Sequence, residues 1–369
     1  MLTAGKCMNK KPLLVVLFLA VMWSCTPDYY DQVFQIAREA GIPLIQVAYT
    51  KGDTRVTYEV STVPEIVARK DGKTVFQAAS LSKPVFAYIV MRMSDRGEID
   101  LDRPLFEYTD IERFVDKELA RRLTARMVLS HMTGLPNWAV SPGSPEWPEA
   151  AIVFKFRPDS AFSYSGEGYA FLQRAVEQIQ GKGLEEIARN EVFLPLGMSS
   201  SSYTWRDDYD SLAVNGFNRD GEDRGKGNFP RANPAYTLRT TAADYMRFLE
   251  ALSLGTGLGK ESREAIFAPL VQAVRYEGKP RECDQRIFWG LGVGIEKHPE
   301  LGEVAFHWGD NGAFRSLFLV VPKRGLQPQR ILIYFTNSQA GHDIIHEISS
   351  LFLDNKEPIA IHEWVYKNE

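Results

Sequence analysis

Cysteine and histidine, the residue types that most often build disulfides and metal centres, are scarce in this chain of 369 residues. It has three cysteines (Cys7, Cys25 and Cys283) and six histidines. If Cys25 carries a lipid and Cys7 leaves with a leader peptide, Cys283 stands alone and no internal disulfide can form. We therefore expect a fold that depends on its hydrophobic core and not on disulfide bonds.

The chain also lacks a strong charge of either sign. Its formal net charge is -4, and no basic block interleaved with aromatic residues occurs. Nucleic acid is therefore excluded as an expected partner. His342 and His346 share a helical face, but no further ligand cluster accompanies them. We predict a solvated helix face there, with no metal and no cofactor.

One apolar run, LLVVLFLAVMW (13–23), follows two lysines near the N-terminus, and it is short for a membrane span. Together with Ser24 and Cys25 it predicts a signal peptide at 1–25, of the lipoprotein type, with Cys25 as the lipidated residue. The protein would then be exported and periplasm-facing, and its only membrane contact would be this N-terminal lipid anchor. Because Met22 and Trp23 fit that cleavage pattern poorly, an ordinary signal or an uncleaved anchor stays open.

The rest of the sequence places strand patterns at both ends of the chain and helical patterns in the middle. We predict one α/β (α+β sandwich) domain at 26–356, followed by a C-terminal tail at 357–369. Its antiparallel sheet, built from about 40–80 and 285–356, is flanked by helices, and an all-helical lobe is inserted at about 98–240. Strands are expected at 42–50, 54–60, 287–298, 303–309, 313–322 and 330–337, and helices at 29–40, 80–95, 168–180, 241–254 and 342–354.

The segment AASLSKPVFAYIVMRM (78–93) carries the first candidate catalytic residues. Pro84 is tolerated only in a first turn, so a helix should begin near Ser80 and place Lys83 on the same face. A hydroxyl at a helix N-terminus lies near free N–H groups, and a desolvated lysine has a lowered pKa and can take its proton. Taken alone, the pattern more often describes a helix cap with a surface lysine. Ser82 points elsewhere and is assigned to capping or packing.

Several further segments follow in a fixed order, and as a set they resemble the serine β-lactamase and penicillin-binding-protein superfamily. The nucleophile segment has the S-x-x-K pattern of that superfamily. The other matching segments are LTARMVLSHMTGLPNW (123–138), FSYSGEGYAFLQRAVE (162–177), FLPLGMSSSSYTW (193–205), YTLRTTAADYMRFL (236–249), WGLGVGI (289–295) and FHWGDNGAFRS (306–316). The resemblance covers roughly 30–350 and is closest to the class C β-lactamase, esterase and D-amino-acid peptidase branch. It implies a β-lactamase/transpeptidase-like fold with the site between sheet and helical lobe.

The resemblance also implies roles for individual residues. Ser80 would be the nucleophile, and Lys83 with Tyr164 would move its proton, with Tyr164 drawn toward phenolate character by the lysine. The backbone N–H groups of Ser80 and Asp310 would form the oxyanion hole. His307, Trp308 and Gly309 stand where the family has its third motif, and together with Gly166 and Trp138 they are expected to bind substrate.

Two positions depart from the family pattern. Gly166 replaces the asparagine of Y-x-N, so the site lacks an amide side chain there, and Glu167 follows it. His307 replaces a lysine, which should make the binding of a carboxylate weaker or pH-dependent. These departures favour an ester or D-amino-acid peptide, a small molecule or a peptidoglycan-derived substrate, over efficient β-lactam hydrolysis. The alternative is a penicillin-binding or sensor-like protein with little or no turnover.

Overall fold

The computed structural model describes residues 1, 28–69, 71–110, 112–276 and 278–366. The predicted leader and its lipidation site, Cys25, lie outside the described residues. Cys283 is described, and its thiol is buried and free of any disulfide. Of the helices in the described ranges, none combines the length and the apolar character needed to cross a membrane.

Eight antiparallel strands form the main sheet, in the order β2-β1-β10-β9-β8-β7-β6-β5. The N-terminal hairpin therefore pairs with the last strand of the chain, with Val47 opposite Tyr334 in the register. A second, two-stranded sheet joins β3 to β4. The strands are β1 (Leu44–Lys51), β2 (Thr54–Ser61), β3 (Phe76–Gln77), β4 (Arg239–Thr240), β5 (Val271–Gln272), β6 (Ile287–Trp289), β7 (Gly294–His298), β8 (Gly302–Asp310), β9 (Arg315–Val321) and β10 (Arg330–Thr336).

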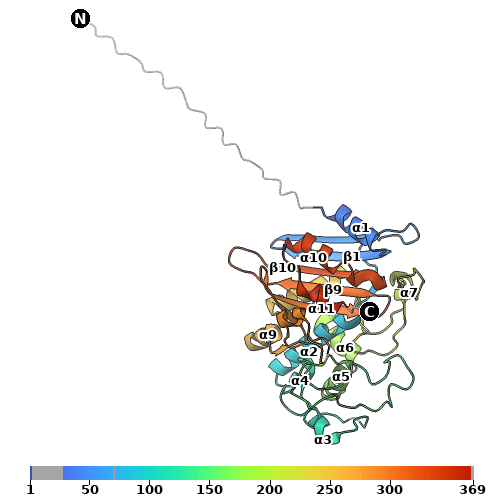
Figure 1. Ribbon diagram of the computed structural model, residues 1–369, viewed down its shortest axis with the longest axis vertical. Coiled ribbons are helices and arrows are strands. Elements are labelled where there is room, and N and C mark those ends of the chain that lie inside the picture. Colours follow the sequence, from blue (N-terminus) through green and yellow to red (C-terminus); the bar gives the residue numbers. More distant parts are fainter. Residues whose placement is uncertain (2–27, 70, 111, 277, 367–369) are drawn as a thin grey trace.

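Helices cover both faces of the main sheet, and further helices form a helical lobe on the side of the sheet away from α1 (Figure 1). One face carries α1, α10 and α11, and the other carries α2 and α8. Helix α3 lies at the end of the molecule opposite α1, and α4 and α5 lie between it and the sheet. The helices are α1 (Tyr30–Glu39), α2 (Ser82–Asp95), α3 (Lys117–Ala120), α4 (Ala125–Leu129), α5 (Gly166–Gln180), α6 (Leu184–Ala188), α7 (Tyr209–Leu212), α8 (Ala242–Leu254), α9 (Lys260–Phe267), α10 (Ile345–Leu353) and α11 (Ala360–Val365).

Alternation along the strands divides the interior into two cores. In β10, Ile331 and Ile333 face the core that contains α2, whereas Leu332 and Tyr334 face the core that contains α10 and α11. Successive side chains of a strand point to opposite faces, so each central strand contributes to both cores. Helix α2 is buried on almost every side, as expected for a helix enclosed between the sheet and the helical lobe.

The predicted antiparallel α/β architecture is confirmed, with differences at element ends. Ser80 lies in a short 3₁₀ turn, and α2 begins two residues later, at Ser82. The predicted tail contains α11, whose Trp364 is fully buried against the sheet side. His342 precedes α10 and is buried, with its Nε2 3.4 Å from the carbonyl oxygen of Ser316. The predicted solvated face is therefore wrong for His342. No group of three potential metal ligands occurs in the described chain.

Candidate active site

The nucleophile segment turns sharply between β3 and α2. Ala79 has a φ of +50°, in the left-handed region, which costs a residue with a side chain on the order of 1–3 kcal/mol. The next residue, Ser80, is half-buried, whereas its neighbours Ala79 and Leu81 are fully buried. Such strain concentrates at functional sites, because the surrounding structure must hold it in place. The turn thus presents the hydroxyl of Ser80 at the start of a buried helix.

Lys83 lies next to this hydroxyl in a desolvated position. Its Nζ atom is 3.2 Å from Ser80 Oγ and donates a hydrogen bond of 2.8 Å to the carbonyl of Ala235. The side chain is 1% exposed, and within the described ranges no carboxylate forms an ion pair with it. Burial holds the pKa of Lys83 well below its ordinary value. The lysine is therefore predisposed to be neutral, which is the form that can accept the proton of Ser80.

Ser82, the other serine of the segment, has a structural environment. Its hydroxyl donates to the carbonyl of Ala79 at 2.6 Å and accepts the N–H of Leu238 at 3.0 Å. These two bonds tie the strained turn to the segment that leads into β4. The structure thus gives Ser82 the packing role expected from the sequence.

Tyr164 lies against the same lysine from the helical-lobe side. The Lys83 Nζ atom is 4.7 Å from the centroid of the Tyr164 ring. The Tyr164 hydroxyl is buried and has no hydrogen-bond partner within ordinary geometry. Burial raises the pKa of Tyr164, and a weaker interaction with the Ser80 hydroxyl partly opposes this rise. Burial therefore disfavours the phenolate character that the family resemblance implied for Tyr164.

His131 belongs to the 123–138 segment, to which the sequence argument gave no catalytic role. Its ring centroid lies 4.3 Å from that of Tyr164, and its Nδ1 atom accepts the N–H of Ser165 at 3.1 Å. The residue is fully buried and has a φ of +57°, in the left-handed region that few non-glycine residues other than asparagine, aspartate and histidine adopt. Burial holds the pKa of His131 well below its usual range. A neutral His131 therefore fixes Tyr164 through the ring and through the next peptide group.

Strand β8 approaches the nucleophile turn at Gly309. A Cβ atom at this position would collide with the hydroxyl of Ser316 and the carbonyl oxygen of Ala78. Ser316 also donates a hydrogen bond of 3.1 Å to that carbonyl. Only glycine permits so close an approach, which sets the end of β8 beside Ser80. This proximity is what the predicted oxyanion hole, formed by the N–H groups of Ser80 and Asp310, requires.

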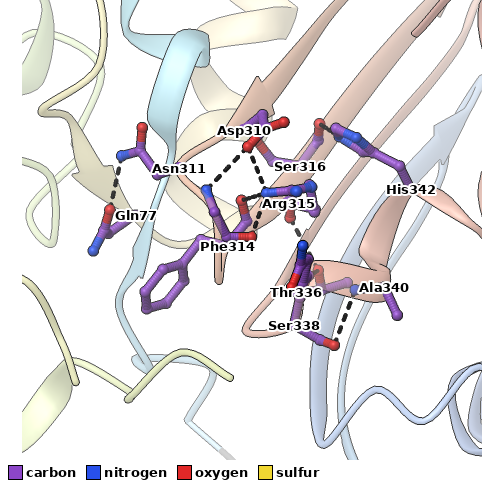
Figure 2. Close-up of polar contacts among 12 residues, drawn as sticks. Gln77, Asp310, Asn311, Phe314, Arg315, Ser316, Thr336, Ser338, Ala340 and His342 are labelled. Atoms are coloured by element: carbon purple, nitrogen blue, oxygen red, sulfur yellow. Dashed lines mark hydrogen bonds and ion pairs between the residues drawn. The ribbon is translucent and has the colours of Figure 1, made fainter. Parts of the chain in front are cut away.

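The residues after Gly309 are fixed by a polar network (Figure 2). Arg315 donates to the Asp310 carboxylate at 2.6 Å, so this carboxylate is engaged at the strand end. Asn311 donates to Gln77 at 2.7 Å and to the carbonyl of Tyr236 at 3.2 Å. The network joins the end of β8 to the residue before the nucleophile turn and to the segment that accepts from Lys83.

His307 and Trp308 lie deeper than the sequence argument expected. They are 0% and 4% exposed, and the His307 Nδ1 atom is 2.8 Å from the carbonyl oxygen of Trp308. Burial holds the pKa of His307 well below its usual range. A direct contact between His307 and substrate would require this side chain to become accessible. In the observed position it packs behind Tyr164, with ring centroids 6.0 Å apart.

Gly166 begins α5 and is covered by the indole of Trp138. A Cβ atom on Gly166 would lie within 2.7 Å of three carbons of that indole. The neighbouring Glu167 does not point toward Lys83. Its carboxylate instead receives two bonds of 3.0 Å from Arg113, one of 2.9 Å from Trp147 and one of 3.0 Å from the N–H of Ala139.

Arg275 is a charged residue at this site that the sequence argument did not identify. Its guanidinium carbon lies 4.6 Å from the ring centroid of Trp308 and 5.1 Å from that of Trp364. Its charge acts on Tyr164, whose pKa it lowers slightly. Among the described residues no carboxylate lies within ion-pair distance of this arginine. The residue precedes an irregular stretch and belongs to no motif, so no pattern in the sequence marked it.

The beta-lactamase family model matches residues 31–347, which is most of the chain. The chain belongs to the beta-lactamase family. The fold is therefore that of the serine β-lactamase and penicillin-binding-protein superfamily, as predicted from the sequence.

Individual relatives and solved structures are similar to this chain as well. Penicillin-binding protein 4 of Amycolatopsis lactamdurans is 32% identical over 136 residues, covering 35% of this chain and 36% of that protein. Penicillin-binding protein 4* of Bacillus subtilis is 22% identical over 326 residues, covering 74% and 64%. The chain thus spans less than two thirds of the length of either relative. The D-amino acid amidase of Ochrobactrum anthropi SV3 has a TM-score of 0.69 at 21% identity, covering 85% of this chain and 92% of that one.

Proposed function

We propose that this member of the beta-lactamase family is a serine hydrolase that works through an acyl-enzyme on Ser80. The observation that carries the proposal is the 3.2 Å separation of Ser80 Oγ and Lys83 Nζ at a fully desolvated lysine. A neutral amine at this distance can act as the general base for the serine hydroxyl. No cofactor or metal enters this chemistry.

In the proposed reaction Lys83 accepts the proton of the nucleophile, and Tyr164 donates a proton to the leaving group. Ser80 Oγ attacks the carbonyl carbon while its proton passes to Lys83 Nζ. The N–H groups of Ser80 and Asp310 hold the oxygen of the tetrahedral intermediate. When the bond to the leaving group breaks, the Tyr164 phenol gives its proton to that group and recovers one from the Lys83 ammonium. Water then attacks the acyl-enzyme, and the same residues accept and return its proton.

We propose an ester or a D-amino-acid peptide or amide as the substrate, in preference to a β-lactam. Gly166 supplies no amide group, and the D-amino acid amidase shares the fold. Arg275, which has no carboxylate partner at ion-pair distance in the described chain, provides a cation for a carboxylate on the leaving group. A carboxylate-bearing peptide would therefore interact with Arg275 rather than with the buried His307.

Hydrolysis of p-nitrophenyl esters, nitrocefin and D-Ala-D-Ala peptides by the wild type and by Ser80→Ala tests the proposal. We expect Ser80→Ala to lose at least about 10³-fold in kcat and to lose labelling by a fluorophosphonate. Ser82→Ala is the matched control, and it should still be labelled although its turn is less stable. A Ser80→Ala variant that retained hydrolysis would overturn the assignment. Wild type labelled by a fluorescent penicillin but inert toward every substrate would instead establish the sensor-like alternative.

A further inference from the structure

The indole of Trp138 occupies the space beside the catalytic pair that a side chain at position 166 would fill. Gly166 lies two residues after Tyr164, and the indole rests on it closely enough to exclude a Cβ atom. On its other side, Trp138 packs edge-to-face on Tyr236, with ring centroids 5.6 Å apart. The residue before Tyr236 accepts the hydrogen bond of Lys83. Trp138 therefore lies between two segments that both contact the catalytic lysine or tyrosine.

This indole is held in place before any substrate arrives. The N–H groups of Gly166 and Glu167 each donate to the carbonyl of Asn137 at 3.0 Å, so the backbone before Trp138 is fixed to α5. The Glu167 carboxylate, whose side chain is 0% exposed, fixes the backbone after it through the N–H of Ala139. Trp147 packs edge-to-face on Trp138 at 5.9 Å and donates to the same carboxylate. Because the indole is held from both sides, it cannot move to accommodate a polar group without losing these contacts.

We infer that Trp138 is a specificity-determining wall, which makes the site favour acyl groups with an apolar flank over acyl groups that carry an acylamino substituent. The inference rests on the proposed serine hydrolase function. An acylamino group directed at this wall would leave its N–H and C=O facing an aromatic ring and Gly166, which has no side chain to bond them. An alkyl or aryl flank loses nothing there and buries apolar surface against the indole.

A larger space lies beside the residues that hold Trp138 in place, although Trp138 itself does not line it. A cavity of 650 Å³ is lined by Trp147, Glu167 and Tyr236, the three side chains that brace or flank Trp138, together with Arg174 and Arg231. Truncation of the indole should open the catalytic side toward this cavity. The range of accepted acyl groups should then widen toward bulkier and more polar ones.

The test compares two p-nitrophenyl esters with one leaving group, the butyrate and the N-acetylglycinate. The measured quantity is the ratio of their kcat/KM values, each corrected for the hydrolysis rate without enzyme. We expect the wild type to favour the butyrate by about tenfold or more. Trp138→Ala and the double variant Trp138→Ala/Gly166→Asn should lower this ratio by about tenfold, the double variant more strongly because its amide can bond the acylamino group. Trp205→Ala, which removes an indole packed on Tyr209 elsewhere, is the control and should keep the wild-type ratio.

Labelling of Ser80 by a fluorophosphonate and a thermal melt accompany each variant. If Trp138→Ala does not fold, Gly166→Ala is the second probe, because one added methyl group must displace the indole. A labelled and active Trp138→Ala enzyme with a ratio unchanged within twofold would overturn the inference and leave the hydrolase proposal intact, and so would such a Gly166→Ala enzyme where Trp138→Ala does not fold. A wild type that favours the N-acetylglycinate would also overturn it. Absence of labelling and of ester hydrolysis in the wild type would overturn the hydrolase proposal itself.

Discussion

The imidazole of His131 lies against the ring of Tyr164, with centroids 4.3 Å apart, and its Nδ1 atom accepts the N–H of the following residue. This pair links the segment before α5 to the proton donor of the proposed reaction. His131 does not contact the reacting atoms, so we regard it as a positioning residue. Its value to catalysis lies in fixing where the Tyr164 hydroxyl stands.

Replacement of His131 separates positioning from folding. Asparagine tolerates a positive φ and can present an acceptor to the Ser165 N–H, whereas alanine supplies neither property. We expect His131→Ala to lower kcat for a p-nitrophenyl ester by about 10-fold to 100-fold, with a smaller change in KM, and His131→Asn to recover part of the loss. Equal kcat values for the two variants, at equal thermal stability, would contradict the positioning role.

The buried lysine should cost the fold stability at neutral pH. The folded-state pKa of Lys83 is depressed, so the unfolded chain binds a proton that the folded chain lacks. Stability must therefore rise as the pH increases from the folded pKa to the unfolded value near 10.5. We expect Lys83→Met to raise the free energy of unfolding at pH 7 by about 0.5–2 kcal/mol while abolishing acylation. Urea titrations at pH 7 and pH 10 should show the gain shrinking at the higher pH, and a Lys83→Met variant less stable than wild type at pH 7 would refute this.

The same depressed pKa sets the pH dependence of catalysis. A neutral ester should be hydrolysed with a kcat/KM that rises as Lys83 loses its proton, and this limb should lie well below the usual lysine range. Burial keeps His307 neutral, so we do not expect the dependence near pH 7 that its sequence position implied. Lys83→Arg, whose guanidinium stays charged, should be inactive across the profile. A limb near pH 10 in the wild type would show that the lysine is charged at rest.

Gly309 should be intolerant of even a methyl group. Gly309→Ala forces a contact with Ser316 and the Ala78 carbonyl, which should cost about 1–3 kcal/mol and displace β8 from the nucleophile turn. Gly143→Ala is the control, because a methyl group there meets no neighbour within 4 Å. We expect its free energy of unfolding to change by at most about 0.5 kcal/mol. Equal effects of the two substitutions on stability and on fluorophosphonate labelling would contradict the close approach.

Arg275 offers a separable test of leaving-group recognition. Arg275→Gln should raise KM about tenfold for a peptide that ends in a D-alanine carboxylate. The corresponding peptide amide should show little change in KM, because it has no charge for the arginine to bind. Steady-state kinetics on the matched pair measure both values. A similar increase in KM for the amide would show that Arg275 acts through packing on Trp308 rather than through its charge.

Local spacing accounts for what the sequence could predict. Ser80 and Lys83 are three residues apart at a helix start, so their proximity follows from helical geometry even though α2 begins later than expected. The alternation of apolar residues likewise predicted the strands, and Gly181 predicted the end of α5. Tyr164 was identified only through the family resemblance, because no local rule joins it to Lys83.

Features that depend on the path of long loops were beyond such reasoning. Trp138 covers Gly166 because a hydrogen-bonded loop returns to the start of α5, and no period in the sequence encodes that return. Arg275 reaches the site from an irregular segment. The lowered pKa of Lys83 and the raised pKa of Tyr164 arise from burial, which is a property of the assembled core.

The pairing of β1 with β10 has a consequence for when the enzyme can work. Strand β10 is the last strand along the chain, although it lies inside the sheet beside β1. Strand β8, which carries Gly309, also comes late in the chain. Most of the polypeptide therefore has to be present before its first strands find their partner. A nascent or C-terminally truncated chain holds Ser80 and Lys83 but lacks the strands that desolvate and align them. Hydrolytic activity should consequently appear only when the whole sheet has formed. Fragments that end before β8 should not be labelled by a fluorophosphonate.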